Sequence, residues 1–312
     1  MRACDVAGGG NLYLTARPPG AQLRAFELLR LRTPLIPFAY AAGNRALLEV
    51  VEETGRTDVT LLDLGIGRGG QVRALLRNPS ARAAFTSLHV IGVEPDSSAS
   101  TGSGALEIAE ANVLEAAEEA GIPATFTPIA KLAEDLDASD IADAKPRGLF
   151  LASSSFSLHH AVVADGARGR HDALRTLRDA GARAVVLVEP DSNHFDDELD
   201  VRFAFAYRHY RTLAQILHET LSPSDASLVW SEFFAPEIRN VIAHDGCLRV
   251  ERHQELARWA EQLVGAGFTI DPLRDLVPRS AAASGFDVRA QGDAFSLGFR
   301  GTSVLGVLRA RA

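Results

Sequence analysis

The stretch Leu61–Gly70, LLDLGIGRGG, decides the fold of this chain. An apolar run, Val59–Leu64, leads into it and includes the acid Asp63, and glycines then alternate with other residues. Glycine is needed where the backbone turns tightly or approaches a ligand without an intervening Cβ. A helix that starts after such a turn offers free N–H groups at its first residues. The stretch therefore predicts a strand, a ligand-binding turn and a helix.

Two classes of ligand fit this turn. From Gly65 to Gly70 it satisfies the dinucleotide pattern GxGxxG, with the acid Glu94 further along. From Asp63 to Gly69 it reads DxGxGxG, which is typical of class I methyltransferases. A carboxylate at Asp63 helps to bind the cationic amine of S-adenosylmethionine, whereas it would repel a pyrophosphate. The pattern favours S-adenosylmethionine, with Glu94 accepting hydrogen bonds from the ribose in either class.

Apolar runs alternate with helical stretches along the first two thirds of the chain. The runs that indicate strands are Val59–Leu64, Leu88–Val93, Ala124–Ile129, Gly148–Ala152 and Ala184–Val188. The helical stretches between them are Gly70–Leu76, Leu106–Ala120 and His171–Ala180. Continuous apolar strands that alternate with helices indicate a parallel sheet covered on both faces.

The C-terminal part indicates an antiparallel ribbon. Its expected strands are Gly285–Ala290, Ala294–Phe299 and Thr302–Leu308, joined by tight turns. The predicted fold class is α/β. It is a Rossmann-like class I methyltransferase fold with a mostly parallel, seven-stranded-type sheet, an antiparallel C-terminal ribbon and a helical cap.

The domain organisation follows from the helical periodicity outside the sheet. Residues 1–20 are predicted to be a flexible N-terminus, and residues 21–55 an N-terminal helical cap broken near Pro34 and Pro37. Residues 56–312 form the predicted cofactor-binding core, with a helical insertion at about 195–265 that adds to the cap. One helix of the insertion is expected over Val250–Ala266, with Glu251, Arg252 and His253 as its salt-bridged start.

Composition excludes several classes of function. A formal net charge of −8 argues against a nucleic-acid binder, which normally presents a basic face. No apolar run is long enough to span a membrane, and the first residues lack the apolar core of a signal peptide. The two cysteines form no close pair, and no HExxH or similar spacing of ligands occurs. We expect a cytoplasmic protein with no membrane contact and no metal.

Ligands of open α/β sheets lie outside the carboxyl ends of the strands, which places the predicted site. The expected cofactor-binding residues are Asp63, Gly65, Ile66, Gly67, Gly69, Glu94, Pro95, Ile129, Ala130, Ser153 and Ser154. The candidates for a general base are His159, His160 and His194, because imidazole titrates near neutral pH and these residues follow the fourth and fifth strands. The structural alternative is that these histidines orient loops by hydrogen bonds.

Several segments together resemble the GRAS family, a family of plant regulators with bacterial relatives. They are PFAYAAGNRALLE at Pro37–Glu49, VVLVEPDSNH at Val185–His194, Phe203–Tyr210, EIRNVIAHDG at Glu237–Gly246, RVERH at Arg249–His253 and LGFR at Leu297–Arg300. Plant members usually have a degenerate glycine loop, whereas this chain keeps Asp63 and Glu94. The resemblance therefore implies a bacterial-type member with an enzymatic role. The expected substrate-binding residues are Phe38, Asn44, Glu189, Asn193, Tyr207 and Asn240.

The function that follows is an S-adenosylmethionine-dependent methyltransferase of the GRAS family. It would methylate oxygen or nitrogen on a small-molecule acceptor, without a nucleic-acid partner; the oligomeric state stays open. Two alternatives remain at this point. One is a non-catalytic GRAS-type module that binds a ligand or serves as a scaffold. The other is a nicotinamide-dependent oxidoreductase.

Overall fold

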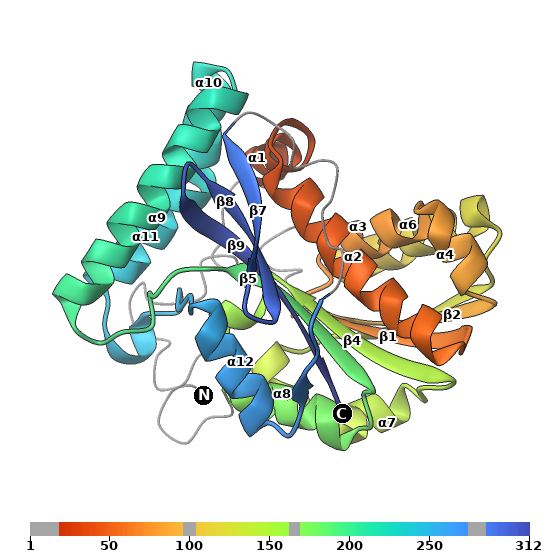
Figure 1. Cartoon of the computed structure of the whole chain (residues 1–312). Helices are drawn as coiled ribbons and strands as arrows, with labels where there is room; N and C mark the ends of the chain where they lie inside the picture. Colours follow the sequence, from red (N-terminus) through yellow and green to blue (C-terminus); the bar gives the residue numbers. More distant parts are fainter. Residues whose placement is uncertain (1–18, 96–103, 162–168, 274–284) are drawn as a thin grey trace.

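A computed structural model of the chain describes residues 19–95, 104–161, 169–273 and 285–312 (Figure 1). The predicted flexible terminus at residues 1–20 falls almost wholly outside the described residues, and residues 19 and 20 begin the first helix.

The described residues form a mixed sheet of nine strands at the centre of the molecule. Its strands are β1 Asp58–Leu64, β2 Ser87–Val93, β3 Ala124–Ile129, β4 Leu149–Ser155, β5 Ala184–Pro190, β6 Thr269–Ile270, β7 Phe286–Gln291, β8 Ala294–Phe299 and β9 Thr302–Arg311. Their order is β3-β2-β1-β4-β5-β9-β8-β7, and the short β6 pairs with β9. Strands β1 to β5 are parallel, and β9 is antiparallel to both β5 and β8. The predicted α/β fold with an antiparallel ribbon is confirmed, with a wider sheet than the expected seven strands.

The strand order explains where a ligand can bind. The chain passes from β1 outward to β2 and β3, then returns to place β4 on the other side of β1. The helices that follow β1 and β4 therefore lie on opposite faces of the sheet. In open α/β sheets, the carboxyl ends of the two strands at such a change of direction, here β1 and β4, are the usual position of a ligand.

Helices cover both faces of the sheet (Figure 1). They are α1 Pro19–Arg32, α2 Leu35–Thr54, α3 Gly70–Leu76, α4 Pro79–Ala84, α6 Ala105–Ala120, α7 Ala138–Asp143, α8 Arg170–Asp179, α9 Leu199–Thr220, α10 Pro223–Val229, α11 Ala235–Ala243 and α12 Leu256–Gly265. Helices α2, α3 and α6 share one buried apolar cluster with the sheet, and α8 and α12 share a second one on the other face. Alternate residues of β1 serve the two clusters: Val59 and Leu61 lie in the first, and Leu62 and Leu64 in the second. Helices α9 to α11 stand beside the β8–β9 end of the sheet, where α9 contacts β9 (Figure 1).

Helix α2 is the main cover of the first face. It begins at Leu35, so the predicted break is shorter than expected and Pro37 lies in the first turn of the helix. Proline is tolerated there because the N–H it lacks would have no partner inside the helix. Gly43 allows α2 to approach β5 closely: a Cβ at this position would lie 3.1 Å from the Cγ2 atom of Val188.

The predicted helix Val250–Ala266 is wrong in its first turn, because α12 begins only at Leu256. The preceding residues are held in a non-helical path by distant partners. Asn240 accepts hydrogen bonds from the backbone N–H groups of Val250 and Glu251, at 2.8 and 2.9 Å. The backbone N–H of Arg252 donates to the carbonyl of His159. The expected salt-bridged helix start is therefore a buried, extended segment.

Candidate functional site

The glycine loop after β1 has the conformation that its sequence predicts. Gly65, Gly67 and Gly69 all have positive φ angles, of 74°, 53° and 76°, which side chains with a Cβ rarely adopt. The backbone N–H groups of Gly65 and Ile66 both donate to the carbonyl of Val93, at 2.8 and 3.2 Å. These bonds hold the loop against the end of β2, and α3 begins directly after it at Gly70.

Asp63 is a buried carboxylate at the carboxyl end of β1. Asp63 is only 4% exposed, and its Oδ1 atom accepts a hydrogen bond from Ser153 Oγ at 2.7 Å. Burial raises the pKa of Asp63 to about 7, the Ser153 hydrogen bond opposes this, and the charge of Glu94 adds to it. Within the described residues, no basic side chain forms an ion pair with Asp63. A ligand that carries a cation would therefore find an uncompensated negative group here.

Glu94 follows β2 on the other side of the loop. Its Oε2 atom accepts a hydrogen bond from the Gly67 backbone N–H at 3.0 Å. Burial raises the pKa of Glu94, and the Gly67 hydrogen bond lowers it in part. Among the described residues, no atom lies within 4 Å of a Cβ built at Gly67, which leaves space at this position of the loop. At Gly65, in contrast, a built Cβ would clash with the side chain of Ser157.

Sequence reasoning missed Tyr40 at this site. A Cβ at Gly70 would lie 2.7 Å from the Tyr40 hydroxyl, and burial together with the charge of Asp63 raises the pKa of Tyr40. Asn44, one helical turn later, donates to the backbone carbonyl of Gln71 at 3.1 Å. The spacing of Tyr40 and Asn44 on α2 is the signal that could have found the tyrosine, because residues four apart share a helix face.

The same edge of the sheet, at the carboxyl ends of the parallel strands, also holds a second buried carboxylate, Glu189, at the end of β5. Its Oε1 atom accepts hydrogen bonds from the backbone N–H groups of Ser157 and Leu158, at 3.2 and 2.9 Å. Its Oε2 atom lies 2.6 Å from His159 Nδ1, in the short helix η2 (Leu158–His160). Burial raises the pKa of Glu189 to about 7. The segments after β4 and β5, which the sequence places near one another, are thus in direct contact.

Three further histidines and one further carboxylate, Glu251, lie around the Glu189–His159 pair. His160 Nδ1 lies 3.3 Å from Glu251 Oε1, while His159 Nε2 and His253 Nε2 each lie 3.7 Å from Glu251 Oε2. His194 stacks on His253 with ring centroids 4.5 Å apart. We call these residues, His159, His160, His194, Glu251 and His253, the histidine cluster.

Residues 14–305 match the GRAS domain family. The chain belongs to that family. The Scarecrow-like transcription factor PAT1 of Arabidopsis thaliana is 28% identical over 285 residues, covering 87% of this chain and 57% of that protein. The DELLA protein GAI of Solanum lycopersicum is 29% identical over 262 residues, covering 77% of this chain and 42% of that protein.

Among solved structures, the crystal structure of SCL7 in Oryza sativa shares the GRAS fold. It has a TM-score of 0.80 and 20% sequence identity, and the match covers 94% of this chain and 84% of that one. The chain spans about half the length of the curated relatives that it matches.

These comparisons correct the predicted function. The prediction of a methyltransferase that acts on a small molecule is wrong, because the GRAS relatives include a named transcription factor. The predicted partners, a small-molecule acceptor and no nucleic acid, are wrong for the same reason. The relatives named above are plant proteins, which conflicts with a bacterial-type member. In the described part of the chain, every helix is too short or too polar to cross a membrane.

The other cofactor-binding residues predicted for this GRAS domain lie along the carboxyl ends of β1 to β4. Ile66 is buried against Gly92, whose built Cβ would lie 3.1 Å from Ile66 Cδ1. Ser154 is fully buried on β4. The carbonyl of Ile129 accepts a hydrogen bond from the Glu94 N–H, and Pro95 and Ala130 flank these two positions. Their contact with a ligand stays a prediction.

The predicted substrate-binding residues have varied surroundings. Phe38 is fully buried in the apolar core, and Asn240 binds the backbone of the segment before α12. Asn193 accepts a hydrogen bond from the Asp196 N–H at 3.2 Å. Tyr207 is 58% exposed on the outer side of α9. Sequence periodicity could not separate Tyr207 from the buried Tyr210, since both fit a helical stripe.

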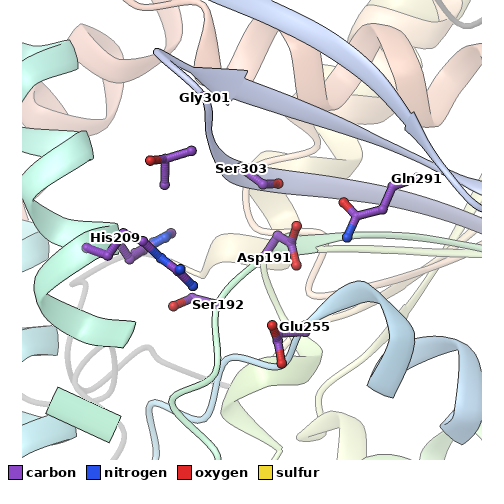
Figure 2. A pocket seen from close by; sticks show the side chains of 9 residues that line it. Asp191, Ser192, His209, Glu255, Gln291, Gly301 and Ser303 are labelled. Atoms are coloured by element: carbon purple, nitrogen blue, oxygen red, sulfur yellow. The ribbon is translucent and has the colours of Figure 1, made fainter. Parts of the chain in front are cut away.

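A polar cavity of about 230 Å³ lies between α9, the β9 strand and the segment after β5 (Figure 2). Figure 2 shows His209 reaching in from α9, with Asp191, Ser192 and Glu255 at the other wall. Ser192 Oγ lies 3.0 Å from His194 Nε2, which connects the cavity wall to the histidine cluster.

Proposed function

We propose that this GRAS domain is a non-catalytic ligand-binding module. Its glycine loop binds an adenosyl ligand, such as S-adenosylmethionine or S-adenosylhomocysteine, and its effect is exerted through protein contacts rather than methyl transfer. The observation that carries the proposal is the pair of carboxylates, the buried Asp63 and the partly buried Glu94, on either side of a loop whose middle glycine has no described residue within contact distance of a built Cβ.

Asp63 is the group that would hold the methionine amine. An ionised carboxylate in a buried position is costly unless it is paired with a cation. Asp63 has a hydrogen bond from Ser153 but no ion pair within the described residues. An ammonium group beside it would supply the missing charge and lower its pKa.

Glu94 is the group that would hold the ribose. Its Oε2 atom is oriented by the Gly67 N–H, and a carboxylate can accept further hydrogen bonds on its remaining lone pairs. Ribose hydroxyls are suitable donors. The open space at Gly67 leaves room for the nucleoside beside this carboxylate. Ser157, which lies over Gly65, would contact the methionine part of the ligand.

Two of the three candidate histidines, His159 and His194, argue against methyl transfer. A general base must reach the proton that it abstracts. His159 and His194 are 4% and 0% exposed, and burial with neighbouring positive groups holds the pKa of each well below its ordinary value. His159 is bound to Glu189 and His194 to Ser192. These contacts favour the structural role that the sequence left as an alternative.

Helix α9 carries a surface suited to protein contacts. Leu199, Phe203 and Tyr207 are 52%, 53% and 58% exposed at intervals of one helical turn, and the rings of Phe203 and Tyr207 stack. Exposed apolar patches on a soluble protein often mark interaction sites. The named relative PAT1 is a transcription factor, which agrees with a module that acts through macromolecular contacts.

Isothermal calorimetry of the whole chain with S-adenosylhomocysteine tests ligand binding. We expect saturable binding by the wild type, loss on Asp63→Asn and Glu94→Gln, and no change on Glu118→Gln, an exposed acid on α6. Absence of binding by the ligand-free wild type would overturn the ligand assignment. Multiple-turnover formation of S-adenosylhomocysteine from S-adenosylmethionine with any acceptor would instead overturn the non-catalytic assignment.

A further inference from the structure

We propose that His159, His160 and Glu251 form a binding site for a divalent transition-metal ion, with Zn²⁺ as the best match. The site is separate from the glycine loop and does not depend on the proposed function. One ligand atom from each of the three residues lies within 4.8 Å of the others. Two imidazoles and one carboxylate, with a further position open, form a known donor set for zinc.

The distances between ligand atoms suit a tetrahedral ion. Bonds of about 2.0–2.2 Å from zinc to nitrogen and oxygen place two ligand atoms of one tetrahedron about 3.4 Å apart. His160 Nδ1 is 3.3 Å from Glu251 Oε1, and His159 Nε2 is 3.7 Å from Glu251 Oε2. Small side-chain rotations would bring all three atoms into the first coordination shell.

The hydrogen bond between His159 and Glu189 decides which nitrogen of His159 is available. Glu189 Oε1 accepts two backbone N–H groups, as an ionised carboxylate does, and Oε2 is 2.6 Å from His159 Nδ1. His159 therefore donates from Nδ1, and its Nε2 lone pair faces the Glu251 carboxylate. A positive species bound between these two acceptors would be attracted by both of them. A carboxylate that orients a metal-binding histidine in this way is a recurrent feature of zinc sites.

Glu251 is fully buried among imidazoles. His160 and His253 are its hydrogen-bond partners, with His160 Nδ1 at 3.3 Å from Oε1 and His253 Nε2 at 3.7 Å from Oε2. A buried carboxylate is strongly unfavourable unless a positive group compensates its charge. Without metal, a proton on the imidazole of His160 supplies that charge. A metal ion at the same place would replace this proton and would also contact His159 Nε2, which lies 3.7 Å from Oε2.

The surroundings supply a fourth ligand and an entry path. His253 Nε2 is also 3.7 Å from Glu251 Oε2, so it completes the coordination or hydrogen-bonds a bound water. The His160 side chain is 12% exposed, which gives the site its access to solvent. The buried guanidinium of Arg170, which binds the His159 and Arg252 carbonyls, opposes a cation. Glu251 and Glu189 lie beside the same histidines and offset this positive charge in part.

Such an ion would join segments that are far apart in the chain. His159 and His160 follow β4, whereas Glu251 precedes α12 and lies within the helical insertion. The bound metal would therefore fasten the helical insertion to the sheet. The sequence contained no signal for the site because its ligands are in irregular segments about ninety residues apart, not at helical spacing.

Metal titration of the whole chain, after dialysis against a chelator, tests the site. We expect the wild type to bind one equivalent of Zn²⁺ by calorimetry, and Co²⁺ with the visible absorption of a tetrahedral complex. Its melting temperature should rise with metal, because ligands of the folded state stabilise it. The control His171→Asn, at a surface histidine whose side chain is 45% exposed, should behave as the wild type.

Variants of the proposed metal-binding residues distinguish this site from metal bound elsewhere on the protein. Glu251→Gln and His160→Asn should abolish the Co²⁺ absorption, and Glu189→Gln should weaken binding by roughly 10–100-fold through loss of the His159 orientation. His160→Asn, at the most accessible ligand, keeps the test valid if Glu251→Gln fails to fold, as judged by circular dichroism. No metal uptake by the wild type, or unchanged uptake by His160→Asn, would refute the assignment.

Discussion

Replacement of Asp63 by asparagine should stabilise this protein at neutral and higher pH. The change keeps the size of the side chain and an Oδ1 acceptor for Ser153, and it removes a charge that burial disfavours. The pKa of Asp63 in the folded protein is about 7, against an ordinary value of 3.8. A difference of this size corresponds to about 4 kcal/mol between the two protonation states.

The sign follows from proton linkage. As the pH rises from about 4, Asp63 loses its proton first in the unfolded chain, so the folded state becomes progressively less stable until the pH passes about 7. Asparagine has no such cost. Asp63→Asn should therefore exceed the wild type in free energy of unfolding by about 2 kcal/mol at about pH 5 and about 4 kcal/mol at about pH 8.

Urea unfolding followed by circular dichroism at both pH values measures this difference. At each pH, Asp63→Asn is compared with the wild type, so that the contributions of all other titrating groups cancel. Asp143→Asn, at an exposed position in α7, provides the matched control and should show no pH-dependent difference. A gain for Asp63→Asn that is equal at both pH values, or a loss at about pH 8, would refute the reasoning that burial dominates the energetics of Asp63.

The remaining predictions concern the ligand and the packing. If an ammonium group binds beside Asp63, affinity for S-adenosylhomocysteine should rise by about tenfold per pH unit up to about pH 7 and then level off, in calorimetry across that range. Leu48→Ala, at a fully buried position of α2, should lower the free energy of unfolding by about 2–5 kcal/mol in urea titrations. Gly43→Val should cost about 1–3 kcal/mol in the same assay, because α2 already touches β5 at this point. Asn240→Ala should remove the acceptor of two buried N–H groups and lower stability by about 2–5 kcal/mol, with faster amide hydrogen exchange at Val250 and Glu251 than in the wild type.

The histidine cluster shows why the sequence could predict where the candidate base residues lie but not what surrounds them. His159 and His194 do follow β4 and β5, and chain order alone brings these two segments together. They pack against Glu251 and His253, which come from a segment that the sequence predicted to be a salt-bridged helix start. Only the contacts of Asn240 with that segment show why it is extended and buried.

The sequence by itself determined the α/β sheet, the glycine loop and the acids at Asp63 and Glu94. These features depend on short-range physics: alternation of apolar runs with helical periodicity, and backbone angles that only glycine adopts easily. The tertiary structure alone decided which polar groups are buried together, as at Glu189 and Glu251, because their partners lie far away in the chain. Burial and pairing of charges are properties of the assembled fold, and no local pattern of residues encodes them.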